Sequence, residues 1–425
     1  MDKFRITGPT PLVGNVQASG AKNAALPALA ASLLTDEPLT LRRAPRVRDL
    51  RTMRRLLDHL GVASAEAEEG AALVLQRVRP DAPPSDAPYE LVKTMRASVL
   101  VLGPLLARHG RARVSLPGGC AIGVRPIDQH LKGLVALGAE VRLAGGYVDA
   151  ICPRLTGARF RFDVTTVTGT ENLMLAACLA RGTTVLDNCA REPEVVDLAH
   201  LLNAMGARIG GAGQKSITIE GVAELHGAEH LVIPDRIEGG TYLIGAALTG
   251  GDVLLEQACA PHLSPLLDAL VSVGVEVTVS EAGIRARANG VLRARDIETA
   301  PYPGFATDLQ AQYMALMTHA EGIAAIRETV FENRFQHAPE LARMGADVRV
   351  EGNTARIHGP TPLAGAHVMA TDLRASACLV LAGVAAEGET VVDRIYHLDR
   401  GYERMELKLQ QLGAQVARIT DSPGI

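Results

Sequence analysis

The stretch Leu137-Gly138-Ala139-Glu140-Val141-Arg142-Leu143 belongs to a pattern that recurs through the 425-residue chain and decides its fold. Its motif, an apolar residue followed by Gly and then Ala or Val, occurs six times, with the glycine at Gly61, Gly138, Gly206, Gly274, Gly345 and Gly413. Successive glycines are 77, 68, 68, 71 and 68 residues apart. Helical spacing of apolar residues precedes each motif and a strand-like run follows most of them, so the glycine fits the end of a helix. The chain is therefore predicted to consist of six similar units.

A second signature lies inside each unit. It is an uncharged run rich in Ala and Leu, at 23–35, 97–107, 172–180, 239–251, 309–320 and 375–386. A helix that is apolar on every side is a buried one. Each unit thus predicts a buried helix, a strand, an amphipathic outer helix and another strand. We expect three units to close around three buried helices with sheets outside, and six units to give two such domains; an ordinary doubly wound α/β protein is the alternative.

The composition excludes several classes of protein. The chain is 47% hydrophobic and 21% charged with a net charge of -4, as in globular proteins. It has no Trp and no basic excess, which argues against a nucleic-acid partner. No uncharged run reaches the ~20 residues of a membrane span, and residues 1–5 (MDKFR) do not begin a signal peptide. We expect a cytoplasmic protein without a membrane partner, and the cysteine spacing predicts no metal site.

Polar residues open the buried helices. Thr307 and Thr371 are explained as helix N-caps. Lys22, Arg96 and Arg374 are not, because a cation at a helix N-terminus opposes the helix dipole and lacks a local stabilising reason. An anion held at these helix starts is the economical explanation. If both domains aim their helix starts the same way, the interdomain cleft becomes an anion site.

One loop carries a single thiol between glycines. Residues 117–120 read PGGC, and Arg125 follows Cys120 by five residues. An exposed loop with a nearby Arg favours a reactive thiolate. The residues alone leave two interpretations of Cys120 open, a catalytic cysteine and a plain loop cysteine. The other five cysteines are expected to be small packed side chains: Cys152, Cys178, Cys189, Cys259 and Cys378.

Eight motifs follow one another along the whole chain. They are residues 20–23 (GAKN), 93–98 (KTMRAS), 117–120 (PGGC), 190–194 (AREPE), 307–312 (TDLQAQ), 331–335 (FENRF), 370–376 (ATDLRAS) and 399–404 (DRGYER). Together they closely resemble the UDP-N-acetylglucosamine 1-carboxyvinyltransferase family of enolpyruvyl transferases, within the EPSP synthase superfamily.

This resemblance implies an α/β fold, a two-domain inside-out α/β barrel with six βαβαββ-like repeats, three in each domain. The first domain would span 21–233 and carry the Cys120 loop, the second would combine 1–20 with 234–425, and the active site would lie in the interdomain cleft. The implied reaction moves the enolpyruvyl group of phosphoenolpyruvate to the 3′-hydroxyl of UDP-N-acetylglucosamine through a tetrahedral ketal and releases phosphate. It is the first committed step of peptidoglycan synthesis. No metal or organic cofactor is implied, and the oligomeric state stays open.

Roles follow from the resemblance by matching position. Cys120 matches a proton donor that also forms a covalent adduct, and Asp308 matches a general base near the sugar hydroxyl. Lys22 and Arg400, with Arg125, match cations that stabilise the ketal. The implied phosphoenolpyruvate contacts are Lys22, Asn23, Cys120, Arg125 and Arg400. The implied sugar-nucleotide contacts are Arg96, Arg125, Pro126, Ile127, Asp128, Gln129, Val164, Thr165, Thr166, Val167, Asp308 and Val330. Further cleft residues are Arg334, Asp372 and Arg374.

One position departs from the family. Many members carry a Lys where this chain has Val164, which puts a diphosphate contact from residues 163–168 in doubt, although backbone N–H groups could supply part of it. Three alternatives remain: an enolpyruvyl transferase with another acceptor, a non-catalytic sugar-nucleotide binder, and a purely structural repeat protein. Cys120, Asp308 and Lys22 are all present, which argues against the binder. Charged residues at the starts of buried helices argue against a purely structural protein.

Overall fold

The computed structural model describes residues 2–78, 86–116, 118 and 127–420. These residues divide into two compact units. Unit 1 is formed by residues 2–19 together with 234–420, and unit 2 by the described residues between 20 and 233. Among the described residues, the chain passes from one unit to the other after Ser19 and after Ile233.

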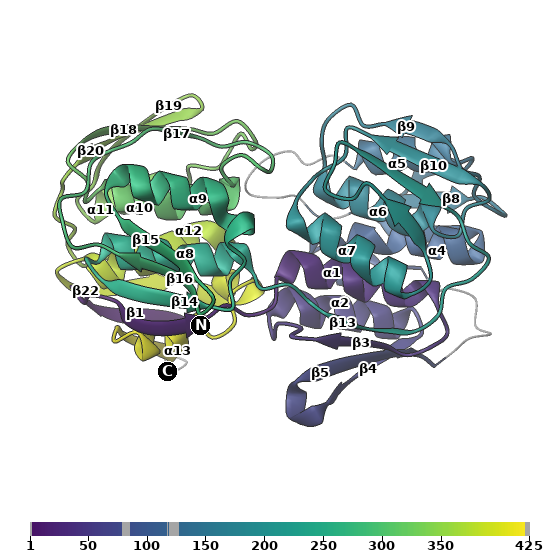
Figure 1. The fold of residues 1–425 in the computed structure, drawn as a ribbon, viewed down its shortest axis with the longest axis horizontal. Coiled ribbons are helices and arrows are strands. Elements are labelled where there is room, and N and C mark those ends of the chain that lie inside the picture. Colours follow the sequence, from purple (N-terminus) through teal and green to yellow (C-terminus); the bar gives the residue numbers. More distant parts are fainter. Residues whose placement is uncertain (1, 79–85, 117, 119–126, 421–425) are drawn as a thin grey trace. The chain divides into compact units, whose positions relative to one another are not determined.

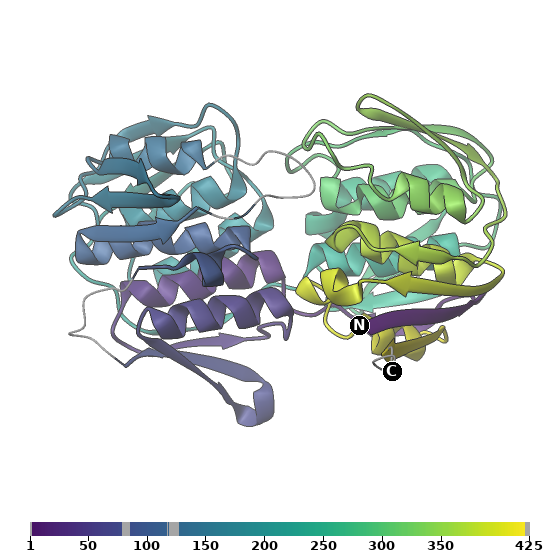
Figure 2. The ribbon, with the colours of Figure 1, turned by 180° about the vertical axis from the view of Figure 1, so that it is seen from behind.

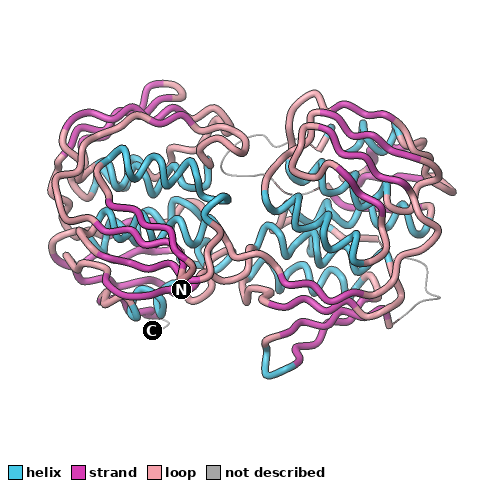
Figure 3. Tube along the Cα trace, in the orientation of Figure 1, coloured by secondary structure: helices cyan, strands magenta, loops and turns pink. Residues whose placement is uncertain are grey.

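In the part of the chain that the structure describes, each unit has three helices at its centre. In unit 2 they are α1 (Lys22–Ala31), α4 (Leu102–His109) and α6 (Val167–Ala177). In unit 1 they are α8 (Arg236–Leu248), α10 (Thr307–Met317) and α12 (Leu373–Ala385). Every residue of α8 after Arg236 is buried, and α8, α10 and α12 pack against one another. Figure 3 shows the helices of each unit enclosed by strands. The buried helices predicted from the uncharged runs are confirmed.

One of these runs winds differently from the others. The segment predicted as a single helix over 97–107 begins as the 3₁₀ helix η3 (Arg96–Val101) and becomes α-helical only at Leu102. Pro104 explains the change, because its nitrogen carries no hydrogen for the carbonyl four residues earlier. An α-helix tolerates proline within its first turn, where α4 holds it.

The described strands form six small sheets, three in each unit, rather than the single parallel sheet of a doubly wound fold. In unit 2, the first sheet has the spatial order β13 (Ala228–Leu231), β3 (Leu39–Arg42), β5 (Ala72–Arg77), β4 (Val62–Ala67). The second sheet has the order β6 (Arg111–Ser115), β8 (Tyr147–Ile151), β7 (Glu140–Ala144). The third sheet has the order β11 (Arg208–Gly210), β12 (Ser216–Glu220), β10 (Thr183–Asp187), β9 (Arg159–Arg161). In unit 1, the first sheet has the spatial order β21 (His367–Met369), β22 (Gly388–Asp393), β1 (Asp2–Gly8), β23 (Gln415–Thr420). The second sheet has the order β15 (Glu276–Ser280), β16 (Gly283–Arg287), β14 (Asp252–Glu256), β2 (Val13–Gln17). The third sheet has the order β17 (Ile297–Glu298), β18 (Gly322–Arg327), β20 (Thr354–Gly359), β19 (Asp347–Glu351). Figures 1 and 2 show these sheets on the outside of each unit.

The sheets follow one repeat. In the sheet of β9–β12, β9 runs parallel to β10 with Phe160 opposite Leu186, and β12 runs antiparallel to β10 with Ile217 opposite the same leucine. A central helix lies between the parallel strands in sequence, which gives the order βαβαββ. The terminal strands β1 and β2 complete two sheets of unit 1, and β13 completes the sheet of β3. Among the described residues, a parallel bridge between Ala87 and Val114 takes the place of the first strand in the sheet of β6. The predicted repeat is therefore confirmed.

The outer helices end where the repeated glycine predicts. They are α2 (Arg48–His59), α5 (Asp128–Ala136), α7 (Pro193–Ala204), α9 (Ala260–Val273), α11 (Ala338–Arg343) and α13 (Met405–Gln411). The six glycines that follow have φ between 90° and 108°. This left-handed backbone suits glycine and closes the helix. The remaining short helices are η1 (Ser32–Leu34), η2 (Glu68–Gly70), α3 (Tyr89–Val92) and η4 (Ile395–Arg400). Over the described ranges, no helix has the length and apolar character that crossing a bilayer requires.

Candidate functional site

At the start of α10, unit 1 holds a carboxylate between two guanidinium groups. Asp308 Oδ1 accepts a hydrogen bond from Arg334 Nη2 at 2.7 Å, and its Oδ2 accepts one from Arg374 Nη2 at 2.8 Å. Both arginines are 3% exposed, whereas the Asp308 side chain is 26% exposed. The two cations favour the charged carboxylate and fix its orientation. The exposed part leaves Asp308 open to an incoming group.

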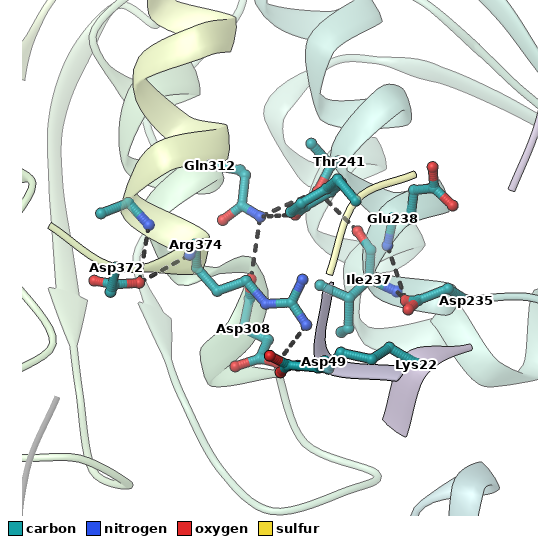
Figure 4. Close-up of polar contacts among 12 residues, drawn as sticks. Lys22, Asp49, Asp235, Ile237, Glu238, Thr241, Asp308, Gln312, Asp372 and Arg374 are labelled. Atoms are coloured by element: carbon teal, nitrogen blue, oxygen red, sulfur yellow. Dashed lines mark hydrogen bonds and ion pairs between the residues drawn. The ribbon is translucent and has the colours of Figure 1, made fainter. Parts of the chain in front are cut away.

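Arg374 is charged although it is buried. Burial lowers its pKa, but the neighbouring Asp308 carboxylate and other groups raise it, and the resulting pKa lies above the ordinary value for arginine. The N–H groups of Arg374 and Ala375 donate to Asp372 Oδ1 at 2.8 and 3.1 Å, so Asp372 caps α12 (Figure 4). Four predicted site residues, Asp308, Arg334, Asp372 and Arg374, are therefore close in unit 1.

Two predicted helix caps are wrong. Asp372 takes the position expected for Thr371, because its carboxylate reaches two free N–H groups of the first turn. Ala306 occupies the N-cap of α10, since the Thr307 hydroxyl donates instead to Glu328 Oε2 at 2.8 Å.

Glu328 is a buried carboxylate that the sequence did not single out. Its Oε1 accepts hydrogen bonds from the Thr299 hydroxyl at 2.9 Å and from the Val330 and Phe331 N–H groups at 2.7 and 3.1 Å. It thereby fixes the backbone around the predicted contact Val330, which is half-buried. A lone Glu at the end of a strand gives no sequence signal for this role.

Lys22 opens α1 in unit 2 and lies beside a buried carboxylate. Its Nζ is 3.4 Å from Oδ2 of Asp49, which is on α2 and 4% exposed. Asn23 follows in the first turn and is half-buried. Two of the cations at the helix starts therefore have carboxylate partners, Asp49 for Lys22 and Asp308 for Arg374. The partners lie on other helices, where the sequence alone does not locate them.

The Gln129 side chain ties two segments together. Its Oε1 accepts from the Asp163 N–H at 2.9 Å, and its Nε2 donates to Asp163 Oδ2 and to Asp128 Oδ2, each at 3.0 Å. Lys132 Nζ is 2.6 Å from Asp163 Oδ2, and this contact, followed by that of Gln129, lowers the pKa of Asp163. Gln129 is 4% exposed, so it positions the segment that follows Asp163.

The segment after Asp163 leads into α6. Val164 is 60% exposed. The Thr165 hydroxyl donates to Asn188 Oδ1 at 3.3 Å, and Thr166 Oγ1 accepts from the Gly169 N–H at 3.2 Å and caps the helix, which begins at Val167. Ile127 is half-buried and directly precedes α5.

His130 is a buried neutral imidazole beside this segment. Its Nδ1 accepts a hydrogen bond from Asn172 Nδ2 at 2.9 Å, so its Nε2 carries the proton and faces the Thr168 hydroxyl at 3.3 Å. Burial lowers the pKa of His130 to about 4, and the positive charge of Arg96 adds to the effect, while Asp128 opposes it. The half-buried Arg96 opens η3.

This histidine makes stability depend on pH. Its folded-state pKa of about 4 lies below the unfolded value of ~6.5, so the unfolded chain takes up the proton first. The contribution of His130 is complete above pH ~6.5 and is lost as the pH falls toward 4, by up to about 3 kcal/mol. We expect His130→Asn to flatten the pH dependence of urea unfolding over this range. Equal pH slopes in the variant and the wild type would refute the assignment.

The remaining predicted residues are Arg400 and three residues outside the described ranges. Arg400 ends η4 and is half-buried. Cys120, Arg125 and Pro126 lie outside the described residues, so their roles stay predictions. Among the described residues, no three His, Cys, Asp or Glu side chains form a group that could hold a metal ion.

The cysteines within the described ranges differ in exposure. Cys152, Cys178, Cys189 and Cys378 are buried, as expected. Cys259 is half-buried, so its prediction as a packed side chain is wrong. It occupies the N-cap of α9, where the chain enters an outer helix near solvent.

Known proteins resemble this chain over nearly its full length. The EPSP synthase (3-phosphoshikimate 1-carboxyvinyltransferase) family matches residues 6–409. The UDP-N-acetylglucosamine 1-carboxyvinyltransferase of Solibacter usitatus is 58% identical over 421 residues, covering 99% of this chain and 100% of that protein. The protein of the same name from Koribacter versatilis is 56% identical over 427 residues, covering 99% and 97%.

Two solved structures share the fold. The enolpyruvyl transferase NikO from Streptomyces tendae superposes with a TM-score of 0.87 at 28% identity, covering 99% of each chain. An EPSP synthase from Acinetobacter baumannii superposes with a TM-score of 0.77 at 19% identity, covering 99% of this chain and all of that one. Both support the two-domain inside-out barrel.

Proposed function

The chain belongs to the EPSP synthase family of enolpyruvyl transferases, and we propose that it transfers the enolpyruvyl group of phosphoenolpyruvate to the 3′-hydroxyl of UDP-N-acetylglucosamine with release of phosphate. The observation that carries this proposal is the 56–58% identity, over essentially whole chains, to proteins named for that reaction. The reaction is the first committed step of peptidoglycan synthesis, and we place it in the cytoplasm. Both substrates are small molecules.

The reaction needs one acid and one base. A proton must be added to the methylene carbon of phosphoenolpyruvate, which makes the neighbouring carbon electrophilic, and the sugar hydroxyl must lose its proton as it attacks that carbon. The tetrahedral ketal then loses a methyl proton and phosphate, which restores the double bond in the product. We assign the acid to Cys120 and the base to Asp308. The Asp308 carboxylate suits this role, because Arg334 and Arg374 hold both its oxygens while part of the side chain stays exposed.

The ketal and both substrates carry negative charge. We assign the phosphate and carboxylate of phosphoenolpyruvate to Lys22, Arg125 and Arg400, with Asn23 contacting the intermediate. Fixed cations stabilise charge that develops in the transition state. Asp49 supports this role for Lys22, because its buried carboxylate fixes the position of the ammonium group.

The sugar nucleotide is assigned to a second set of residues. These are Arg96, Arg125, Pro126, Ile127, Asp128, Gln129, Val164, Thr165, Thr166, Val167, Asp308 and Val330. Gln129 acts mainly by holding Asp163, since its side-chain amide is already hydrogen-bonded within the protein.

A second acceptor is favoured by one observation. The matching family takes its name from EPSP synthase, a 3-phosphoshikimate 1-carboxyvinyltransferase. Phosphate release from phosphoenolpyruvate should be measured with UDP-N-acetylglucosamine, with shikimate 3-phosphate and with neither acceptor. We expect release only with the sugar nucleotide. Release only with shikimate 3-phosphate would transfer the assignment to the other acceptor.

Val164 gives a prediction about the diphosphate. Its side chain is 60% exposed, so a lysine there costs little packing and adds one cation to the proposed nucleotide segment. We expect Val164→Lys to tighten binding of UDP-N-acetylglucosamine by about two- to fivefold, an effect that weakens as salt rises. Calorimetry at low and high salt measures it.

A matched control is Val135→Lys, because Val135 is 53% exposed on α5 in the same unit and has no assigned role. Tightening by both lysines alike would indicate a general charge effect and contradict the assignment of Val164.

A further inference from the structure

A buried tyrosine connects the three central helices of unit 1. Tyr402 is 2% exposed. Its Oη lies 2.9 Å from Thr241 Oγ1 on α8 and 3.2 Å from Gln312 Nε2 on α10. Its ring centroid is 5.5 Å from Cζ of Arg374 on α12. Figure 4 shows Gln312 and Thr241 facing one another beside Arg374.

The hydrogen bonds of this hydroxyl have a defined direction. Thr241 Oγ1 donates to the Ile237 carbonyl at 2.8 Å, so it accepts from the Tyr402 hydroxyl. Gln312 Nε2, which carries two hydrogens, lies within donating distance of three acceptors: Tyr402 Oη, Thr241 Oγ1 at 3.0 Å and the backbone carbonyl of Asp308 at 3.1 Å. The Tyr402 hydroxyl thus connects α8, through Thr241, to the first turn of α10, through Gln312 and the Asp308 carbonyl.

The ring of Tyr402 contacts Arg374, which binds the Asp308 carboxylate. A guanidinium within about 6 Å of an aromatic face is attracted to it. Arg374, held in this way, also donates to Asp308 Oδ2 at 2.8 Å. Burial raises the pKa of the Tyr402 hydroxyl, so the ring stays a neutral phenol at physiological pH.

The same tyrosine fixes the chain next to Arg400. The N–H groups of Gly401 and Tyr402 both donate to the Leu398 carbonyl at 3.0 Å. Gly401 is pressed against the start of α12, because a Cβ there would lie 2.7 Å from Leu373 Cδ2. Arg400 is the last residue of η4, and its backbone is fixed between Leu398 before it and Tyr402 after it.

We propose that Tyr402 is a positioning residue that sets two cations of the site at once, Arg374 through its ring and Arg400 through the backbone two residues earlier. The hydroxyl anchors the ring to α8 and α10, so a shift of Tyr402 would move Arg374, Arg400 and the Asp308 turn together. This inference rests on the proposed function, in which Arg400 contacts phosphoenolpyruvate and Asp308 is the base.

The test compares three variants in steady-state kinetics. Tyr402→Phe keeps the ring and removes the hydroxyl, and Tyr402→Leu removes both. Tyr313→Phe is the matched control, since Tyr313 is also buried and its hydroxyl donates to the Arg295 carbonyl at 3.1 Å. We expect kcat/KM for phosphoenolpyruvate to fall about tenfold in Tyr402→Phe and about 100-fold in Tyr402→Leu. KM for UDP-N-acetylglucosamine should stay within about threefold, as should all constants of the control.

A second measurement does not depend on turnover. Hydrogen exchange of the wild type and of Tyr402→Phe is followed at 373–376 and 395–401, with and without inorganic phosphate. We expect phosphate to protect these segments in the wild type and to protect them less in the variant. A purely structural role would lower the melting temperature in both Tyr402→Phe and Tyr313→Phe without selectively raising KM for phosphoenolpyruvate.

Two results would overturn the inference: kinetic constants of Tyr402→Phe that match those of Tyr313→Phe, or equal phosphate protection in wild type and Tyr402→Phe. If the wild type releases no phosphate with either acceptor, the proposed function fails, and the exchange measurement alone decides the role of Tyr402.

Discussion

Replacing Asp308 with Asn is expected to lower kcat by about 10²–10⁴ while UDP-N-acetylglucosamine still binds. Asn keeps the shape of the side chain but cannot take the proton of the sugar hydroxyl. It also leaves Arg334 and Arg374 without the charge that now neutralises them, which should lower the free energy of unfolding by about 1–3 kcal/mol. Phosphate release, calorimetry and urea unfolding measure the three effects.

Unit 1 offers a matched control for this variant. Asp252 accepts hydrogen bonds from Arg285 at 2.5 and 2.6 Å and lies 3.8 Å from Arg287, so it too is a carboxylate beside two guanidinium groups. It is the first residue of β14 and has no assigned role in the reaction. Asp252→Asn should leave kcat unchanged. Turnover of Asp308→Asn within threefold of the wild type would exclude the base role.

A phosphonate epoxide such as fosfomycin is expected to abolish activity through one adduct on Cys120. The phosphonate resembles the phosphate of phosphoenolpyruvate, so Lys22, Arg125 and Arg400 should hold it with the epoxide near the sulfur. Such proximity can contribute up to ~7–11 kcal/mol to the reaction. The same cations favour the thiolate, which is the reactive form. UDP-N-acetylglucosamine should speed the inactivation.

The described cysteines sharpen this experiment. Burial raises the pKa of Cys178 and Cys189 to about 12, which disfavours their thiolates. Cys259 is half-buried and could compete with Cys120 for the epoxide. The experiment is therefore repeated in a Cys259→Ser background. Intact mass and peptide mapping should find the adduct on Cys120 in both backgrounds, and Cys120→Asp should keep activity and resist the epoxide. Adducts spread over several cysteines, or full activity after labelling of Cys120, would contradict the assignment.

The architecture could be predicted because it depends on local patterns. The glycine at the end of each outer helix must adopt a left-handed backbone, and Gly61 and Gly413, in the first and last units, have φ of 90° and 94°. The central helices are recognisable because burial on every side removes charge from a whole run, as in α8. Both patterns involve residues that lie close together in the sequence, so they can be recognised without knowing the fold.

The site was less predictable because its partners come from different elements. The cations Lys22 and Arg374 were found by their unfavourable place at helix starts, but the carboxylates of Asp49 and Asp308 that neutralise them are 27 and 66 residues away in the chain. Tyr402 was visible only as part of a motif, since its contacts are to Thr241, Gln312 and Arg374 on three helices. Long-range pairs of this kind leave no periodic signal in one sequence.

The most direct test of the central claim is the mass and connectivity of the nucleotide product. The protein is incubated with phosphoenolpyruvate and UDP-N-acetylglucosamine, and the nucleotide is isolated and examined by mass spectrometry and NMR. We predict that it gains one carboxyvinyl group at the 3′-oxygen, with one phosphate released per product and none from either substrate alone. An unmodified nucleotide under conditions in which the folded protein releases phosphate would contradict the account.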